Sequence, residues 1–166
     1  MIKNQDIVED LVAQFGDNIK DIQEPYGMLT ISTNRENIVQ LVDYLNKSDK
    51  LRFRFLTDIT GIQFPENKGG EFGVIYHLHS FENGVRMRIK VFLAADDVHI
   101  PTMTTLYPTA NWMERETYDF FGILFDGHPN LKRILNIDEM DYFPMRKEYP
   151  LEDATREDKI DALFGR

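Results

Sequence analysis

The stretch WMERETYDFFGI, residues 112–123, decides where the regular structure of this chain ends. It mixes charges of both signs with aromatic side chains and leads into a segment punctuated by prolines. Thr109, just upstream, is a residue type that often caps the start of a helix. Gly122 is the type that most easily takes the positive φ found just past a helix end. The stretch therefore predicts a helix that begins near Thr109 and ends at Gly122.

The charged residues of this helix allow three interpretations, and they are Glu114, Arg115, Glu116 and Asp119. They could form an acid–base cluster of an enzyme. They could instead form intrahelical salt bridges, since Arg115 and Asp119 are four residues apart. We favour a third interpretation, in which part of the cluster orders the junction between the helix and the segment after it. A carboxylate buried among aromatic rings needs a partner, which is either Arg115 or a group on another protein.

Upstream of this helix, apolar spacing predicts two further helices and several strands. Residues 7–15 repeat apolar side chains at helical spacing, and Asn34 could cap a second helix with Ile38 and Leu45 on its apolar face. Alternating patterns predict strands over residues 19–24, 28–33, 51–60, 72–81 and 85–94. Asn83-Gly84 is a strong hairpin signal between the last two. This order predicts an α+β fold, a mixed or antiparallel β-sheet backed by helices.

Composition limits the chemistry that the chain can perform. The 166 residues contain no cysteine, so a thiolate-ligated iron–sulfur cluster and a disulfide framework are both excluded. The formal net charge of −9 argues against nucleic-acid binding and against adsorption to an anionic membrane. No apolar run approaches the roughly 20 residues that cross a bilayer, so we expect no direct membrane insertion.

The C-terminal part of the chain, residues 126–166, loses regular periodicity but keeps many apolar side chains. Three prolines interrupt it, at positions 129, 144 and 150. Apolar surface of this size usually marks a contact with another protein. We therefore divide the chain into an α+β domain over residues 1–125 and an extended, partner-binding tail over residues 126–166.

Several short motifs occur in a specific order and spacing, namely ERE (114–116), DFFGI (119–123), GHP (127–129), RIL (133–135) and PMRKEYPL (144–151). This series resembles the C subunit of the proton-pumping NADH-quinone oxidoreductase, respiratory complex I. The resemblance is clear from about residue 71 to residue 151. Two positions depart from the family pattern: Tyr142-Phe143 stand where Gly-His is expected, and Glu148-Tyr149 replace Asp-Phe.

The resemblance implies a cofactor-free structural and assembly subunit. FMN, iron–sulfur clusters and quinone would be bound by other subunits, which carry electrons from NADH to quinone. The chain would pack mainly against the D subunit of complex I, and also near the B subunit, on the cytoplasmic side of the inner membrane. We expect no catalytic, cofactor or metal residue in it. The residues expected to bind partners are Glu114, Arg115, Glu116, Asp119, His128, Arg133, Phe143, Arg146, Lys147 and Tyr149.

Other functions stay open on the sequence alone. The chain could belong to a related membrane-bound hydrogenase-type complex, or it could be a free-standing enzyme that uses Glu114 and Asp119. His77 and His79 share one face of a strand, but such histidines are more often satisfied by neighbours than bound to metal. The Gly-rich residues 69–73 do not open a helix, so they do not predict a dinucleotide site.

Overall fold

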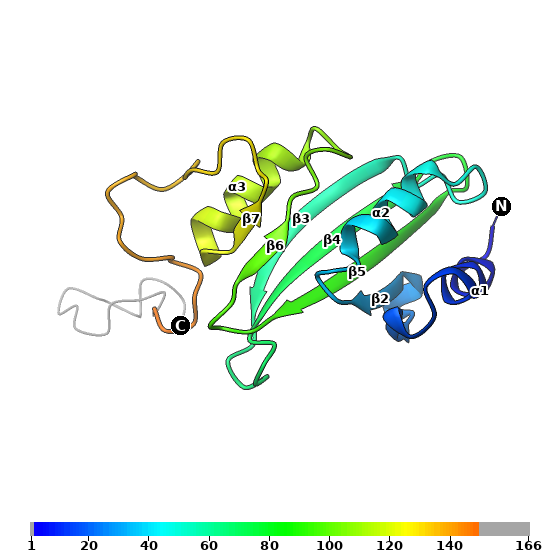
Figure 1. The fold of residues 1–166 in the computed structure, drawn as a ribbon, viewed down its shortest axis with the longest axis horizontal. Coiled ribbons are helices and arrows are strands. Elements are labelled where there is room, and N and C mark those ends of the chain that lie inside the picture. The colour runs from blue at the N-terminus through cyan, green and yellow to red at the C-terminus, as the bar shows by residue number, and fades with distance from the viewer. Residues whose placement is uncertain (1, 150–166) are drawn as a thin grey trace, which may run out of the picture.

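A five-stranded sheet forms the centre of the computed structural model, which describes residues 2–149 (Figure 1). Its strands lie in the order β1-β2-β5-β4-β3, and only the β2–β5 pair is parallel. The sheet is therefore mixed, and the predicted α+β class and the hairpin at Asn83-Gly84 are confirmed. The strands are β1 (Lys20–Gln23), β2 (Leu29–Thr33), β3 (Phe55–Gln63), β4 (Phe72–Ser80) and β5 (Val85–Leu93).

Two helices, α1 (Asn4–Phe15) and α2 (Ile38–Lys47), bury their apolar sides in the core. In Figure 1, α2 crosses in front of β4 and β5. The two helices are joined by the Tyr44 hydroxyl of α2, which donates a hydrogen bond to Asp10 of α1 at 2.7 Å. Contrary to the prediction, Asn34 does not cap α2, because residues 34–37 form a turn and Asn37 occupies the cap position.

The strand predicted over residues 51–60 begins four residues later, at Phe55. Leu51 and Phe53 are buried, which explains their strand-like alternation in sequence. The chain nevertheless turns here, with Arg52 at a φ of 51° and the Phe53 amide donating to the Leu45 carbonyl. These apolar residues fill the core beside α2 without entering the sheet.

The last helix, α3 (Ala110–Phe121), lies beside the edge strand β3 and ends at Gly122, whose φ is 73°. Its start and end match the prediction. Two short strands flank it, β6 (His99–Pro101) and β7 (Leu124–Asp126), and they pair in parallel. They were not predicted, since three residues are too few to show a period. Gly61 lets α3 approach β3 closely, because a Cβ there would lie 2.5 Å from the Phe121 ring.

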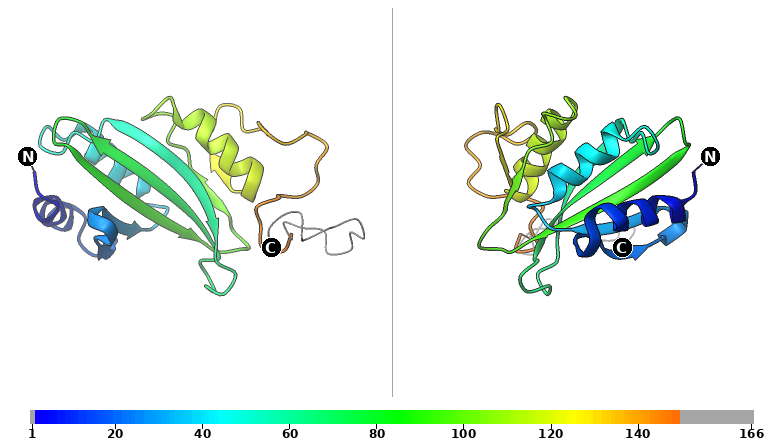
Figure 2. Two further views of the ribbon diagram at one scale, coloured as in Figure 1. Left: turned by 180° about the vertical axis from the view of Figure 1, so that it is seen from behind. Right: turned by 45° about the vertical axis from the view of Figure 1, so that its right-hand side comes forward.

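Residues 127–149, which we call the C-terminal segment, contain no helix or strand. The segment loops around the far side of α3 and returns toward the end of the sheet (Figures 1 and 2). The part of the predicted tail that includes Pro150 and Leu151 lies outside the described residues. Within residues 2–149, no helix is both long and apolar enough to span a membrane.

Candidate functional site

Asp119, on α3, binds the C-terminal segment with both carboxylate oxygens. Oδ2 accepts hydrogen bonds from the backbone amides of Ile134, Leu135 and Asn136 at 3.0, 2.8 and 2.9 Å. Oδ1 accepts from Arg133 Nη1 at 2.8 Å and from Asn136 Nδ2 at 3.1 Å. The side chain is completely buried. Burial alone would raise the pKa of Asp119, but the backbone amides and the guanidinium outweigh it and hold this pKa well below its usual range.

Arg133 folds the segment around this carboxylate. Besides its ion pair with Asp119, its guanidinium donates to the Asp119 carbonyl at 3.0 Å, and to the carbonyls of Met140 and Tyr142 at 2.7 and 2.9 Å. It also lies 5.0 Å from the centre of the Phe143 ring. The ion pair of Arg133 is therefore intramolecular, and the binding of Arg133 to a partner stays a prediction. That pair lies within this chain because Asp119 sits inside the curve of the segment.

Arg115 acts one turn earlier on the same helix. Its guanidinium donates to the carbonyls of Lys132 and Arg133 at 3.1 and 2.8 Å and lies 5.3 Å from the Trp112 ring. The i,i+4 ion pair of Arg115 with Asp119 is therefore not formed, because each group binds the C-terminal segment instead. This confirms the interpretation that part of the charged cluster orders the junction after the helix.

Arg146 closes the segment against the end of α3. Its Nε donates to the Phe121 carbonyl at 2.7 Å, and its guanidinium stacks between the rings of Phe72 and Phe143 at 4.9 and 4.7 Å. Gly122 leaves room for these groups, since a Cβ there would lie 2.5 Å from Phe143 and 2.6 Å from Arg146. We call Arg115, Asp119, Arg133 and Arg146, with the backbone groups they bind, the latch.

The remaining predicted partner-binding residues surround the latch. His128 Nε2 lies 3.1 Å from the Asn111 carbonyl, which fastens the start of the segment to α3. The Lys147 amide donates to Gln63 Oε1 of β3 at 2.6 Å, a contact that no sequence signal predicts. The side chains of Glu116, Lys147 and Tyr149 are exposed. Their binding to a partner stays a prediction.

Glu114 is the other fully buried carboxylate of α3 and faces the opposite way. It accepts hydrogen bonds from Thr102 Oγ1 at 2.5 Å and from the Met103 amide at 2.6 Å, and so ties α3 to the residues after β6. Burial raises the pKa of Glu114 to about 7, although the two hydrogen bonds offset part of this effect. Neither Glu114 nor Asp119 is open to solvent, which weighs against the enzyme interpretation.

The C-terminal segment turns apolar side chains outward while the latch holds its backbone. Leu135 and Ile137 are 65% and 67% exposed. Other large apolar side chains exposed on the segment and on the adjoining face of α3 are Trp112, Tyr142, Met145 and Tyr149. Surfaces of this kind usually contact other proteins, with aromatic residues contributing most of the binding.

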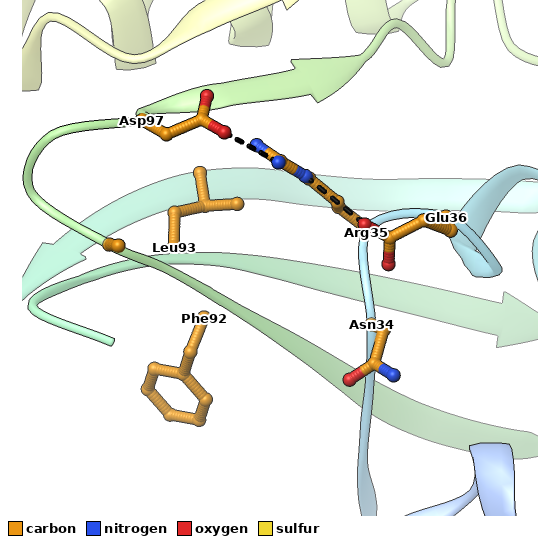
Figure 3. A pocket seen from close by; sticks show the side chains of 7 residues that line it. Asn34, Arg35, Glu36, Phe92, Leu93 and Asp97 are labelled. Atoms are coloured by element: carbon orange, nitrogen blue, oxygen red, sulfur yellow. Dashed lines mark hydrogen bonds and ion pairs between the residues drawn. The ribbon is translucent and has the colours of Figure 1, made fainter. Parts of the chain in front are cut away.

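Two surface hollows differ in character. The first, about 680 Å³ and mainly apolar, runs between the end of β3 and the C-terminal segment, lined by residues that include Ile62, Phe64 and Met145. The second is polar and is bridged by Arg35 and Asp97, whose Nη2 and Oδ2 are 2.5 Å apart (Figure 3). No group of three or more potential metal ligands gathers anywhere in residues 2–149.

Comparisons with known proteins agree with this architecture. The model of the family "Respiratory-chain NADH dehydrogenase, 30 Kd subunit" matches residues 31–155. A relative from Citrifermentans bemidjiense, named as the C subunit of NADH-quinone oxidoreductase, is 40% identical over 157 residues, 95% of this chain and 96% of the relative. The corresponding subunit of Streptomyces coelicolor is 44% identical over 125 residues, 75% of this chain. The chain spans about half the length of the first curated relatives that it matches.

Among solved structures, a trypsin-resistant fragment of Nqo5 is similar, with a TM-score of 0.65 and 31% identity over 78% of this chain and 100% of the fragment. The fold and the latch thus define an α+β domain whose last described segment, residues 127–149, is fastened to α3. The chain belongs to the family of the 30 kDa subunit of respiratory-chain NADH dehydrogenase. The resemblance to the C subunit is thereby confirmed.

Proposed function

We propose that this chain is a cofactor-free structural and assembly subunit of the proton-translocating NADH:quinone oxidoreductase. It packs against the D subunit, with the B subunit nearby, and helps to shape the quinone-reducing module. Other subunits oxidise NADH, pass electrons through iron–sulfur clusters and reduce quinone. The complex holds the chain at its periphery, on the cytoplasmic side of the inner membrane.

The observation that carries the proposal is that the backbone of the C-terminal segment is bound within the chain while its apolar side chains are exposed. The latch uses charged groups within the chain to fix the backbone, and this leaves Leu135, Ile137 and neighbouring aromatic side chains turned outward. A segment fixed before it binds loses less conformational entropy on association. The arrangement is therefore suited to docking on a partner subunit.

The proposed lack of redox cofactors rests on ligand chemistry. Iron–sulfur clusters are held mainly by cysteine thiolates, and the chain has none. The buried carboxylates that could have served catalysis, Glu114 and Asp119, already accept hydrogen bonds from neighbouring groups. Both are better explained as structural groups that fix α3 between the sheet and the C-terminal segment.

Affinity purification of the tagged chain in mild detergent tests the proposal. We expect the D subunit and the other peripheral subunits to co-purify, together with NADH-driven quinone reduction. The chain expressed alone should be colourless and contain no stoichiometric iron or flavin. Stoichiometric iron or NADH oxidation by the isolated chain would contradict the proposal, as would purification of the native chain without partner subunits.

A further inference from the structure

The central strand β5 has a basic row on the side of the sheet away from the helices. Met87, Ile89 and Val91 are buried in the core, whereas Arg86, Arg88 and Lys90 alternate with them and are exposed or partly exposed. Figure 2, left, shows this side of the sheet, with α2 behind the strands. Residues that alternate along a strand point to opposite faces. We call the side that carries the basic row the open face.

The neighbouring strands place two histidines and a second lysine beside the basic row. Arg86 and Arg88 lie in register with His79 and His77 of β4, and Arg88 Nε donates to His77 Nε2 at 2.9 Å. Ser32 of β2 lies between Lys90 and Lys20 of β1. Since Arg88 occupies the Nε2 lone pair of His77, the His77–His79 pair is unsuited to binding a metal.

The basic row lacks acidic partners within the described chain. In residues 2–149, Arg86, Arg88 and Lys90 form no ion pair. One acidic residue, Asp58, lies in register with them, and its Oδ2 is 3.6 Å from His77 Nδ1. Three neighbouring basic side chains without an ion pair in residues 2–149 stand out in a chain with a net charge of −9.

Apolar side chains border the basic row. Ile75 of β4 lies in register with Lys90, and Phe92 follows two residues after Lys90 on the same strand. Figure 3 shows Phe92 and Leu93 pointing to opposite sides of the strand, and Leu93 is in the core. Phe92 in turn lies 6.2 Å from Phe64 between ring centres, and Phe64 is exposed. The open face therefore combines a positive centre with an apolar end.

We propose that the open face is a second docking surface, and that its occupant is an acidic segment of a neighbouring protein subunit. The proposal rests on the function proposed above, since it requires that the chain works inside a complex. Complementary charges fix the register of such a contact and speed its formation. An anionic membrane or a nucleic acid is a poorer occupant, because an extended polyanion would also meet the acidic remainder of the chain.

Carbodiimide coupling in the intact complex tests the proposal, because the reagent joins an amine to a carboxylate only at direct contact. We expect Lys90 to be linked to an aspartate or glutamate of another subunit. Charge reversal by Arg86→Glu with Lys90→Glu should lower the yield of assembled complex at least tenfold. The control, Lys3→Glu with Lys47→Glu, makes the same charge change at exposed sites just before α1 and at the end of α2, and should leave the yield unchanged.

The outcomes separate this inference from the function on which it rests. If the complex assembles normally with Arg86→Glu and Lys90→Glu, and Lys90 couples to no other chain, the inference is wrong while the subunit assignment stands. Binding of the isolated wild-type chain to anionic phospholipid vesicles, lost in the double variant, would identify a membrane as the occupant and overturn it as well. Circular dichroism of the double variant should match the wild type, since both side chains point away from the core.

Discussion

Replacing Asp119 with asparagine should release the C-terminal segment without unfolding the domain. The amide oxygen can keep the three backbone hydrogen bonds made by Oδ2. Its NH2 group then points at Arg133 Nη1, so that two donors face each other where an ion pair of 2.8 Å had been. Removing one charge of a buried ion pair destabilises a protein by about 3–5 kcal/mol. Because Asp119→Asn keeps the three backbone hydrogen bonds, we expect it to weaken the attachment of the segment by about 3 kcal/mol.

Native-state hydrogen exchange measures this loss directly. The amides of Ile134, Leu135 and Asn136 are bonded to the carboxylate, so they exchange only when the segment leaves α3. A loss of about 3 kcal/mol should speed their exchange on the order of 100-fold. Amides of the β4–β5 ladder, such as that of Ile89, should keep their rates, because the domain core does not depend on the latch.

A matched control makes the same chemical change elsewhere. The Asp126 side chain is 60% exposed. In residues 2–149 its carboxylate has one ion-pair partner, the ring of His99. Asp126→Asn should therefore leave the exchange of Ile134, Leu135 and Asn136 unchanged. If Asp119→Asn alters these three rates less than threefold, the carboxylate does not hold the segment and the account of the latch is refuted.

Two further substitutions test neighbouring parts of the structure. The folded-state pKa of Glu114, about 7, lies above its ordinary value of 4.5, so its contribution to stability is fully present below pH 4.5 and is lost as pH rises through 7. Between pH 4.5 and 7, urea titrations should show that the wild type loses roughly 3 kcal/mol more stability than Glu114→Gln. Equal pH profiles of the two proteins would contradict the assignment. Gly122→Ala should lower the midpoint of thermal unfolding more than Gly84→Ala does. Gly84 has a similar positive φ but open space around it, so it controls for backbone strain. Equal midpoints would exclude crowding of the new methyl group by Phe143.

Much of the fold could be predicted from periodicity, because its longer elements bury one regular face. Helix α3 and the β4–β5 hairpin have the predicted positions, since Gly122 and Asn83-Gly84 supply backbone conformations that few other residues adopt. The strand expected over residues 51–60 started too early because Leu51 and Phe53 are buried without joining the sheet. Burial alternates over residues 51–54 as it does in a strand, so the sequence alone does not distinguish a strand from a buried turn at this point.

The latch could be predicted only in part. The mixture of charges and aromatic residues indicated that the helix orders the chain after it, and this is what Asp119 and Arg115 do. The pairing itself was not predictable, because Arg115 at i,i+4 and Arg133, 14 residues from Asp119, are equally suitable by charge. The choice depends on how the segment curves, which brings three backbone amides to the carboxylate and leaves two carbonyls for Arg115.

The latch should present the outward apolar side chains of the C-terminal segment to a partner subunit. Leu135→Ser with Ile137→Ser tests it, with co-purification of the tagged chain in mild detergent as the measurement. Val12→Ser with Ile22→Ser is the control, because each of those side chains is 43% exposed elsewhere on the surface. We predict that the segment variant folds but recovers at least tenfold less of the D subunit, whereas the control recovers as much as the wild type. Equal recovery of the D subunit by both variants would contradict the claim.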